Sequence, residues 1–282
     1  MAQDTVFYQK IKRIFDQKSS PLIMGILNVT PDSFFDGGKY TIEQYWLEHA
    51  KEMIDAGAGI IDIGAYSTRP GAIEVSENEE LERLIKVIFS IRKAFPEILI
   101  SADTFRAEVA KQSVAAGANI INDISGGTID DRMFDAVAEM NATYVLMHIQ
   151  GTPKNMQGDP QYKNVVNEVY DFFIEKLKIL KDSGVENVIL DPGFGFGKTV
   201  EHNYTLLKNL NKFNSLNCPV LVGLSRKSMV NKLLNISSKD SLNGTSVLNE
   251  ISLQNGAKIL RVHDVKEAKE AITIFNYMED LK

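Results

Sequence analysis

Polar side chains that could bind a charged, hydrogen-bonding metabolite recur where short apolar runs of this sequence end. They are Asn28, Asp103, Asn122, Asp123, His148, Asp191, Ser225 to Lys227 and Arg261 to Asp264. Carboxylates accept hydrogen bonds from N–H groups, whereas Lys and Arg bind anions, and Arg also stacks on planar rings. Any one Asp in such a place could simply cap the following helix. Their recurrence favours a binding site, provided that the fold brings the ends of the runs together.

Three segments containing Gly and Pro accompany these residues. NVTPDSFFDGGKY (28–40) and YSTRPGAIEVS (66–76) are longer than a tight strand-to-helix turn requires, so we interpret them as binding loops. DPGFGFGKT (191–199) ends in the Gly-Lys-Thr of a phosphate-binding loop. That motif needs glycine at position 192, where this chain has Pro192, so the spacing excludes a P-loop.

The elements that would position these residues alternate between strand and helix. Eight runs rich in Ile, Val and Leu are candidate strands, at 21–28, 60–65, 98–103, 120–124, 144–148, 188–193, 220–225 and 259–265. They are almost continuously apolar, which is typical of parallel strands that are covered on both faces. Each gap between them has room for a helix, and amphipathic stretches lie at 41–57, 77–95, 106–117 and 165–184.

Strict alternation of strand and helix implies parallel pairing through right-handed crossovers. Eight such units without a linker or a break in composition predict an α/β fold, a single (β/α)8 TIM barrel over residues 21–282 with a short N-terminal extension, residues 1–20. A doubly wound open sheet is the alternative. Barrel enzymes build their active sites at the C-terminal ends of the strands. The polar residues above are therefore predicted to converge on one face.

The composition excludes several other classes of protein. The 31 Lys and Arg against 37 Asp and Glu give a net charge of −6, which argues against a broad nucleic-acid-binding surface but leaves room for a small basic pocket. Cys218 is the one cysteine, so a disulfide framework and a Cys-based zinc site are both excluded. No run approaches the ~20 apolar residues of a membrane span, and the N-terminus lacks a signal-peptide core. We expect a cytoplasmic protein that binds neither nucleic acid nor membrane.

Taken together, the motifs resemble those of dihydropteroate synthase, a folate-pathway family within the pterin-binding barrel superfamily. The matching segments cover about residues 21–275 in family order: GILNVTPDSFFDGG (25–38), IIDIGAYSTRPG (60–71), SADTF (101–105), INDISGG (121–127), VLMHIQGTPKNMQ (145–157), ILDPGFGFGKT (189–199), VGLSRKS (222–228) and RVHDV (261–265). The resemblance implies a transferase that joins 6-hydroxymethyl-7,8-dihydropterin diphosphate to 4-aminobenzoate, giving 7,8-dihydropteroate and pyrophosphate. It also implies a homodimer and a target of sulfonamides.

The resemblance assigns a set of residues to the pterin. They are Asp103, Asn122, Asp191, Lys227 and Arg261, and Met147 and Val262 are expected to bind substrate without being assigned to one part of it. A reduced pterin carries N–H and amino donors beside N and C=O acceptors, which suits carboxylates, an amide and a cation. By the same resemblance Arg261 stacks on the ring, and Asp103, Lys227 and Arg261 are expected to be catalytic.

The remaining assignments concern the diphosphate and 4-aminobenzoate. Thr68, Arg261 and His263 occupy the family's diphosphate positions, and Asn28 corresponds to its Mg²⁺ ligand, with Asp32 also near that ion. The 4-aminobenzoate site is expected to comprise Thr68, Arg69, Pro70, Phe196 and Ser228. Mg²⁺ commonly contacts few protein groups and uses phosphates and water instead. The family's route is SN1-like, with pyrophosphate leaving before the aniline nitrogen attacks.

The chain departs from the family pattern at Tyr66, where Glu is usual, and at Phe35, where Ser is more usual. Three other functions stay open. A pterin-binding methyltransferase barrel would use a corrinoid partner, a Schiff-base aldolase would use Lys227, and a non-catalytic paralogue would bind pterin without turnover. Two further residues have undecided roles: His148 fits core support as well as a site wall, and Asp62 is expected to be a buried, hydrogen-bonded carboxylate.

Overall fold

The computed structural model describes residues 2–29, 42–66, 75–152, 156 and 158–281. Their helices and strands are, in order, α1 (Ala2–Phe15), β1 (Leu22–Asn28), α2 (Ile42–Asp55), β2 (Ile60–Gly64), α3 (Glu77–Ala94), β3 (Leu99–Asp103), α4 (Ala107–Ala115), β4 (Ile120–Asp123), α5 (Met133–Met140), β5 (Thr143–Met147), α6 (Val165–Asp182), β6 (Val188–Asp191), α7 (Val200–Lys208), η2 (Leu210–Leu216), β7 (Val220–Val222), α8 (Ser228–Leu234), η3 (Ser238–Asp240), α9 (Leu242–Gln254), β8 (Ala257–Val262) and α10 (Val265–Asp280).

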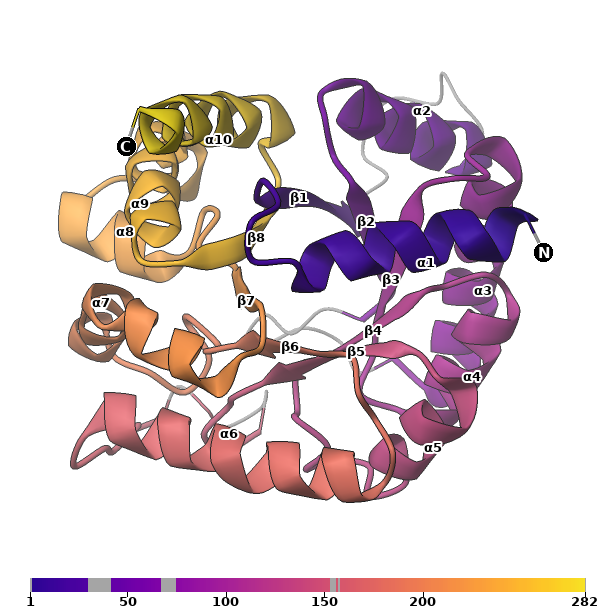
Figure 1. Cartoon of the computed structure of the whole chain (residues 1–282), viewed down its shortest axis with the longest axis horizontal. Coiled ribbons are helices and arrows are strands. Elements are labelled where there is room, and N and C mark those ends of the chain that lie inside the picture. The colour runs from indigo at the N-terminus through magenta and orange to yellow at the C-terminus, as the bar shows by residue number, and fades with distance from the viewer. Residues whose placement is uncertain (1, 30–41, 67–74, 153–155, 157, 282) are drawn as a thin grey trace.

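The eight strands form a closed parallel barrel in sequence order, surrounded by helices (Figure 1). Each observed strand overlaps one of the predicted apolar runs, and the predicted (β/α)8 fold is confirmed. The open-sheet alternative is wrong because β1 pairs with β8, with Leu22 opposite Ile259 and Gly25 opposite Val262. Closure gives every strand two neighbours and leaves no sheet edge.

The apolar core has two compartments because successive strand side chains point to opposite faces of the sheet. One set packs outward against the helices and forms the larger cluster. The other set points into the barrel, and we call it the inner apolar layer. Each strand contributes one residue to it: Met24, Ile60, Leu99, Ile120, Val145, Ile189, Leu221 and Ile259. These eight side chains fill the N-terminal half of the barrel, so that half is a packed core and not a pore.

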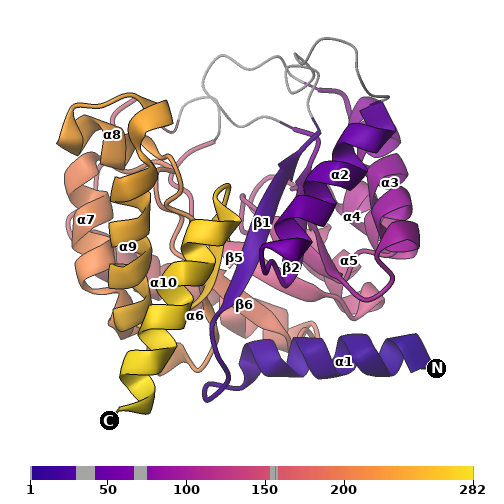
Figure 2. The ribbon, with the colours of Figure 1, turned by 90° about the horizontal axis from the view of Figure 1, so that it is seen from above.

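Helix α1 lies across the N-terminal end of the barrel (Figure 2). Its Phe7, Ile11 and Ile14 pack against the inner apolar layer, and Ile14 is 1% exposed. The guanidinium of Arg92 lies 4.4 Å from the centroid of the Phe7 ring. Burial of a side chain such as Ile14 contributes about 2 kcal/mol to stability. Residues 2–15 therefore close the end of the barrel that is opposite the predicted site.

Local sequence explains where several outer helices begin. At α3, the Ser76 hydroxyl accepts from the Glu79 N–H at 3.3 Å, while the Glu79 carboxylate accepts from the Ser76 N–H at 3.1 Å, forming a capping box. At α6, the Asn164 side chain accepts from the Asn167 N–H at 3.0 Å. None of the helices in the described ranges combines the length and apolarity needed to cross a bilayer.

Candidate functional site

Strand alternation places a polar layer directly above the inner apolar layer. Two positions beyond each apolar residue, the strands carry Ile26, Asp62, Ser101, Asn122, Met147, Asp191 and Arg261, and Gly223 directly follows β7. Side chains two apart on a strand point to the same face. The polar members of this layer therefore face the barrel interior near its C-terminal end, as predicted for an active site.

Arg261 is the centre of this polar layer. Its Nε lies 2.7 Å from Asp62 Oδ2, and its Nη2 lies 2.8 Å from Asp103 Oδ2. Asn122 Nδ2 donates to the same Asp62 oxygen at 3.1 Å. Asp62 is fully buried, whereas Asp103 and Arg261 are partly exposed. The structure thus joins Arg261 and Asn122 through Asp62, which was expected only to be a buried carboxylate, and joins Asp103 to them through Arg261.

Burial and charge shift the ionisation of this cluster. Burial, reinforced by the negative charge of Asp62, raises the pKa of Asp103 to about 7, although Arg261 opposes the shift. Burial alone would lower the pKa of Arg261, but Asp62 and Asp103 outweigh it and raise that pKa above its ordinary value. The cluster therefore holds a permanent cation beside a carboxyl group that can titrate near neutral pH.

Asp191 and Lys227 lie on the β6 and β7 side of the barrel. Asp191 is 6% exposed and accepts from the Gly193 N–H at 2.7 Å; burial raises its pKa, and Lys227 opposes that shift. Lys227 Nζ donates to the Phe194 carbonyl and lies 4.7 Å from the centroid of the Phe196 ring. Burial lowers the pKa of Lys227 to about 8, with Asp191 opposing. An ammonium, a carboxyl group and an aromatic face are thus close together here.

His263 is held by Ser225 at the ends of β8 and β7. Ser225 Oγ lies 3.0 Å from His263 Nδ1 and also accepts from the His263 N–H at 3.2 Å. Ser228 is exposed at the start of α8, and Asn28 is exposed at the last position of β1. All four residues therefore lie at the C-terminal face, where an anionic substrate could reach the exposed Asn28 and Ser228 and the partly exposed His263.

Apolar side chains form one wall of the site. Met147 is 2% exposed and packs with Phe105 and Ile124, with Phe196 at the edge of the same cluster. Val262 needs a correction as a substrate contact, because its side chain is fully buried in the outer core. It follows the inward-facing Arg261 by one position, so it points to the opposite face of the sheet.

Some predicted residues lie outside the described ranges. They are Asp32, Phe35, Thr68, Arg69 and Pro70. In the described part of the chain, no group of three or more His, Cys, Asp or Glu side chains could hold a metal ion. The exposed amide of Asn28 nevertheless offers the kind of hard oxygen donor that Mg²⁺ accepts, and Mg²⁺ can take its other ligands from phosphates and water.

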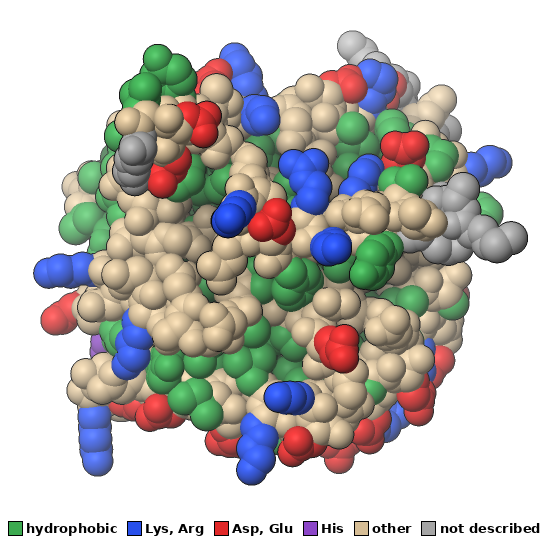
Figure 3. Space-filling view, viewed as in Figure 1, with side chains coloured by type: hydrophobic (Ala, Val, Ile, Leu, Met, Phe, Trp, Pro, Cys, Tyr) green, Lys and Arg blue, Asp and Glu red, His purple; other side chains and the backbone are tan. Residues whose placement is uncertain are grey.

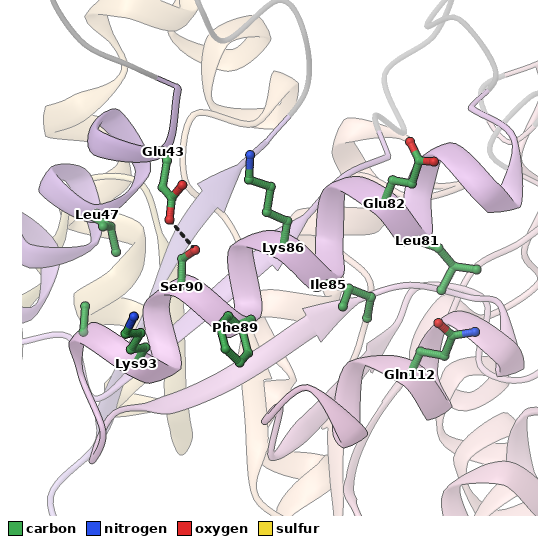
Figure 4. Close-up of a pocket in the computed structure, with 11 residues that line it drawn as sticks. Glu43, Leu47, Leu81, Glu82, Ile85, Lys86, Phe89, Ser90, Lys93 and Gln112 are labelled. Carbon is green, nitrogen blue, oxygen red and sulfur yellow. Dashed lines mark hydrogen bonds between the residues drawn. The ribbon is translucent and has the colours of Figure 1, made fainter.

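A separate groove of about 940 Å³ lies outside the barrel, between α2 and α3 (Figure 4). Leu47, Ile85 and Phe89 line it, and Ser90 Oγ donates to Glu43 Oε1 at 2.8 Å beside them. Its described lining includes none of the predicted site residues. The polar layer at the strand ends, with its perturbed carboxyl and ammonium groups, is therefore the better candidate for chemistry.

Sequence reasoning missed the roles of Asp62 and Lys198. Asp62 interrupts an otherwise apolar strand and has the inward parity of the site layer, a pattern that marks it as a partner for another inward residue. Lys198 was considered only as part of a rejected P-loop, yet it is 4% exposed and lies in the loop after β6. No local pattern identifies its partners, because they come from two different loops.

Comparison with protein families and curated sequences places the chain among enzymes of known type. The model of the pterin-binding enzyme family matches residues 24–263. The dihydropteroate synthase of Escherichia coli (strain K12) is 48% identical over 258 residues, which cover 91% of each chain.

Solved structures show the same similarity in three dimensions. The Yersinia pestis dihydropteroate synthase, solved with a sulfonamide drug, superimposes with a TM-score of 0.87 at 44% identity and covers 93% of this chain and 95% of its own. The Xanthomonas albilineans dihydropteroate synthase, solved with 4-aminobenzoic acid, gives a TM-score of 0.86 at 38% identity and covers 94% of each chain.

Proposed function

Because this chain belongs to the pterin-binding enzymes and, among them, to the dihydropteroate synthases, a class of transferases, we propose that it joins 6-hydroxymethyl-7,8-dihydropterin diphosphate to 4-aminobenzoate with release of pyrophosphate. The observation that carries this proposal is the Arg261 cluster. One guanidinium bound by Asp62 and Asp103, with Asn122 on the same carboxylate, supplies the donors, acceptors and planar cation that a pterin requires.

The pterin lies in the polar layer of the barrel. Asp103 and Asp191 accept hydrogen bonds from its ring N–H and amino groups. Asn122 and Lys227 donate to its N and C=O acceptors. Both carboxyl groups have pKa values raised by burial. Donors on the bound ring and the nearby cations would favour their ionised forms. Arg261 stacks on the ring while its two carboxylate partners keep the guanidinium plane in place.

The diphosphate lies at the exposed rim of the same face. His263 and Arg261 contact its oxygens, and Asn28 is the residue that would hold Mg²⁺. A bound Mg²⁺ would neutralise charge on the departing pyrophosphate. His263 is oriented for this contact by Ser225, whose hydroxyl lies 3.0 Å from Nδ1. Fixed groups that stabilise developing charge commonly supply a large share of catalysis.

4-Aminobenzoate lies between Phe196 and the start of α8, with its carboxylate on Ser228. The reaction is SN1-like: the C–O bond to the diphosphate breaks first, and the pterin methylene cation is delocalised into the ring. The aniline nitrogen then forms the new C–N bond and loses a proton. An aniline is already neutral at pH 7, so this step needs no strong general base. Stabilisation of the leaving group is the larger task for the protein.

The central test is turnover by the purified protein with both substrates and Mg²⁺. We expect release of pyrophosphate and formation of dihydropteroate, with a sulfonamide competing against 4-aminobenzoate. Absence of pyrophosphate release would reject the synthase. The order of bond breaking is tested without 4-aminobenzoate, by following an ¹⁸O label in the bridging C–O–P position. Scrambling of the label supports prior departure of pyrophosphate, and retention of the label argues for concerted displacement.

We also propose that the enzyme is a cytoplasmic homodimer. Large apolar side chains are exposed on α8, α9 and α10, namely Leu233, Leu234, Val247, Ile274, Tyr277 and Met278. Part of this apolar surface is visible on the side of the molecule that carries the C-terminus (Figure 3). Light scattering after size exclusion should give twice the 31.5 kDa chain mass, and a monomer mass would reject the dimer. The unpaired thiol of Cys218 suits a reducing compartment, and cell fractionation tests that location.

A further inference from the structure

Lys198 is a buried ammonium to which the proposed reaction gives no task. Its Nζ donates to the carbonyl oxygens of Gly193 and Phe196, each at 3.0 Å, and to that of His148 at 3.3 Å. Nδ1 of the His148 ring lies 3.0 Å from the same atom. Gly193 and Phe196 belong to the loop after β6, whereas His148 directly follows β5. One side chain therefore ties two loops of the C-terminal face together.

This arrangement is energetically costly. Burial lowers the pKa of Lys198 to about 7; Asp191 opposes this shift and Lys227 adds to it. Within the described ranges, the hydrogen-bonding partners of Nζ are three backbone carbonyl groups and the His148 ring, and none is a carboxylate. A buried cation that lacks a carboxylate partner is tolerated only if its hydrogen bonds compensate for the lost hydration. Any functional role of Lys198 is therefore expected to lie in the loop whose carbonyl groups it binds.

The loop bound by Lys198 carries groups of both substrate subsites. Phe196 presents its ring to the Lys227 ammonium at 4.7 Å, and the Phe194 carbonyl accepts from that ammonium. The Gly193 N–H donates to Asp191 at 2.7 Å. A shift of this short loop would consequently move the aromatic wall for 4-aminobenzoate first, and would change the environment of Lys227 and Asp191 with it.

We propose that Lys198 is a positioning residue that fixes the ring of Phe196 for 4-aminobenzoate by binding the carbonyl groups of Gly193, Phe196 and His148. It does not touch the substrate itself. This inference rests on the proposed synthase function, since that function defines the 4-aminobenzoate side of the site.

The position of His148 follows from this role. While Lys198 is protonated it can only donate, so His148 Nδ1 then accepts, the imidazole is neutral with its proton on Nε2, and the three N–H donors are shared among four acceptors. Burial, together with the charge of Lys198, lowers the pKa of His148 well below its ordinary value. The ring packs edge-on against Phe172, with the centroids 5.0 Å apart. His148 is therefore held between Phe172 and Lys198, where it supports the lysine.

Gly193 is required at its position for the same reason. A Cβ atom there would lie 1.9 Å from the His148 carbonyl oxygen, and the backbone has φ +69°. A side chain would push the two loops apart at the point where Lys198 bridges them. The left-handed turn at Gly193 therefore allows the close approach of the two loops that Lys198 binds together.

The test compares Lys198→Met with Lys208→Met, an exposed position on α7. In Lys198→Met we expect the KM for 4-aminobenzoate to rise ~10-fold or more, with kcat and the KM for the pterin diphosphate changed by less than about threefold. His148→Phe, which keeps a ring but removes the acceptor, should shift the same KM in the same direction. Equal losses in all three kinetic parameters, or an unchanged KM for 4-aminobenzoate, would overturn the proposal.

A second measurement does not depend on turnover. Hydrogen exchange of the peptide that spans residues 191–199 should be faster in Lys198→Met than in the wild type and in Lys208→Met. Unchanged exchange would contradict the positioning role even if the wild type proved inactive, a result that would by itself reject only the synthase function. If Lys198→Met does not fold, Lys198→Gln keeps a shorter donor and is measured in its place.

Discussion

Two cations at the C-terminal face of the barrel, Arg261 and Lys198, are held in opposite ways. Arg261 contacts two carboxylates, Asp62 and Asp103, at 2.7 and 2.8 Å. Lys198 contacts three backbone carbonyl groups and the imidazole of His148. The pKa of Arg261 is raised above its ordinary value because the carboxylates outweigh the effect of burial. Burial lowers the pKa of Lys198 to about 7, and the negative charge of Asp191 does not outweigh it.

The difference shows how a buried cation can serve either a ligand or the protein. A guanidinium binds carboxylates along its edge and still presents a flat face to an aromatic ring. Arg261 therefore remains charged and available to the pterin and the diphosphate. An ammonium donates its N–H groups to single acceptor atoms. Those of Lys198 are bonded mostly to backbone carbonyl groups. The first arrangement suits catalysis, and the second suits the alignment of loops.

The largest effect is expected when the catalytic cation is removed. Arg261→Met should lower kcat/KM ~1000-fold, because it removes a charged contact to both the pterin and the leaving group. It should also lower the free energy of unfolding by about 3 kcal/mol, because Asp62 and Asp103 lose their cation. Steady-state kinetics and urea denaturation measure the two quantities.

The matched control for this prediction is Arg226→Met. Arg226 lies on the same face, its side chain is 43% exposed and it pairs with Asp264 at 2.5 Å. Ion pairs near the surface contribute at most about 1 kcal/mol, and the proposed function gives Arg226 no substrate contact, so this variant should stay within about threefold of wild-type kcat/KM. A comparable loss in both variants would mean that Arg261 contributes only to the general field of the face.

The next effect concerns the carboxylate that supports Arg261. Asp62→Asn keeps the shape of the side chain but removes its charge from Arg261 and Asn122, and it should lower kcat/KM ~30-fold. Asp55→Asn, at an exposed pair with Lys51 on α2, is the control. Wild-type activity in Asp62→Asn would show that Asp103 alone holds the guanidinium.

The same variant should change the pH dependence of catalysis. Burial and the charge of Asp62 raise the pKa of Asp103 to about 7, so kcat/KM should fall as the pH drops through that value and Asp103 is protonated. Removal of the Asp62 charge lowers the pKa of Asp103, which moves the acid limb of the profile to lower pH. An acid limb at an unchanged pH would assign the titration to another group.

The contrast between the two cations also marks how far sequence reasoning reaches. The strands were predictable because burial on both faces makes them almost continuously apolar, and Asp103, Asn122, Asp191 and Arg261 stand out as polar residues at or near the ends of such runs. Asp62 could not be assigned to Arg261 in advance, since the two residues are 199 positions apart and barrel closure brings them together. The outward orientation of Val262 followed from strand alternation once Arg261 was placed inside.

Lys198 was less predictable because its partners are mostly backbone carbonyl groups, which every residue carries. Its environment depends on the left-handed turns at Gly193 and Gly197 and on the approach of the β5 end, none of which leaves a side-chain pattern. The Gly-Lys-Thr sequence suggested a phosphate-binding loop, but the glycine spacing excluded that motif. The sequence indicated no other role for Lys198. Loop packing, and not local composition, determines the function of this lysine.

The smallest predicted effect separates the two cations by stability alone. The pKa of Lys198 is about 7 in the folded chain but 10.5 as its ordinary value, so between these values the unfolded chain binds the extra proton. The free energy of unfolding should therefore rise with pH in this window, by about 1 kcal/mol per pH unit for this group. Urea denaturation at about pH 7.5 and about pH 8.5, both in the lower half of this window, should show this gain in the wild type relative to Lys198→Met. Arg261→Met should keep the gain, because Lys198 is unchanged in this variant. The guanidinium that the variant lacks stays protonated over this pH range in the wild type. The free energy of unfolding could instead change equally with pH in the wild type and in Lys198→Met. That result would mean that the lysine stays charged among its carbonyl acceptors, and that its hydrogen bonds offset burial more fully than its lowered pKa implies.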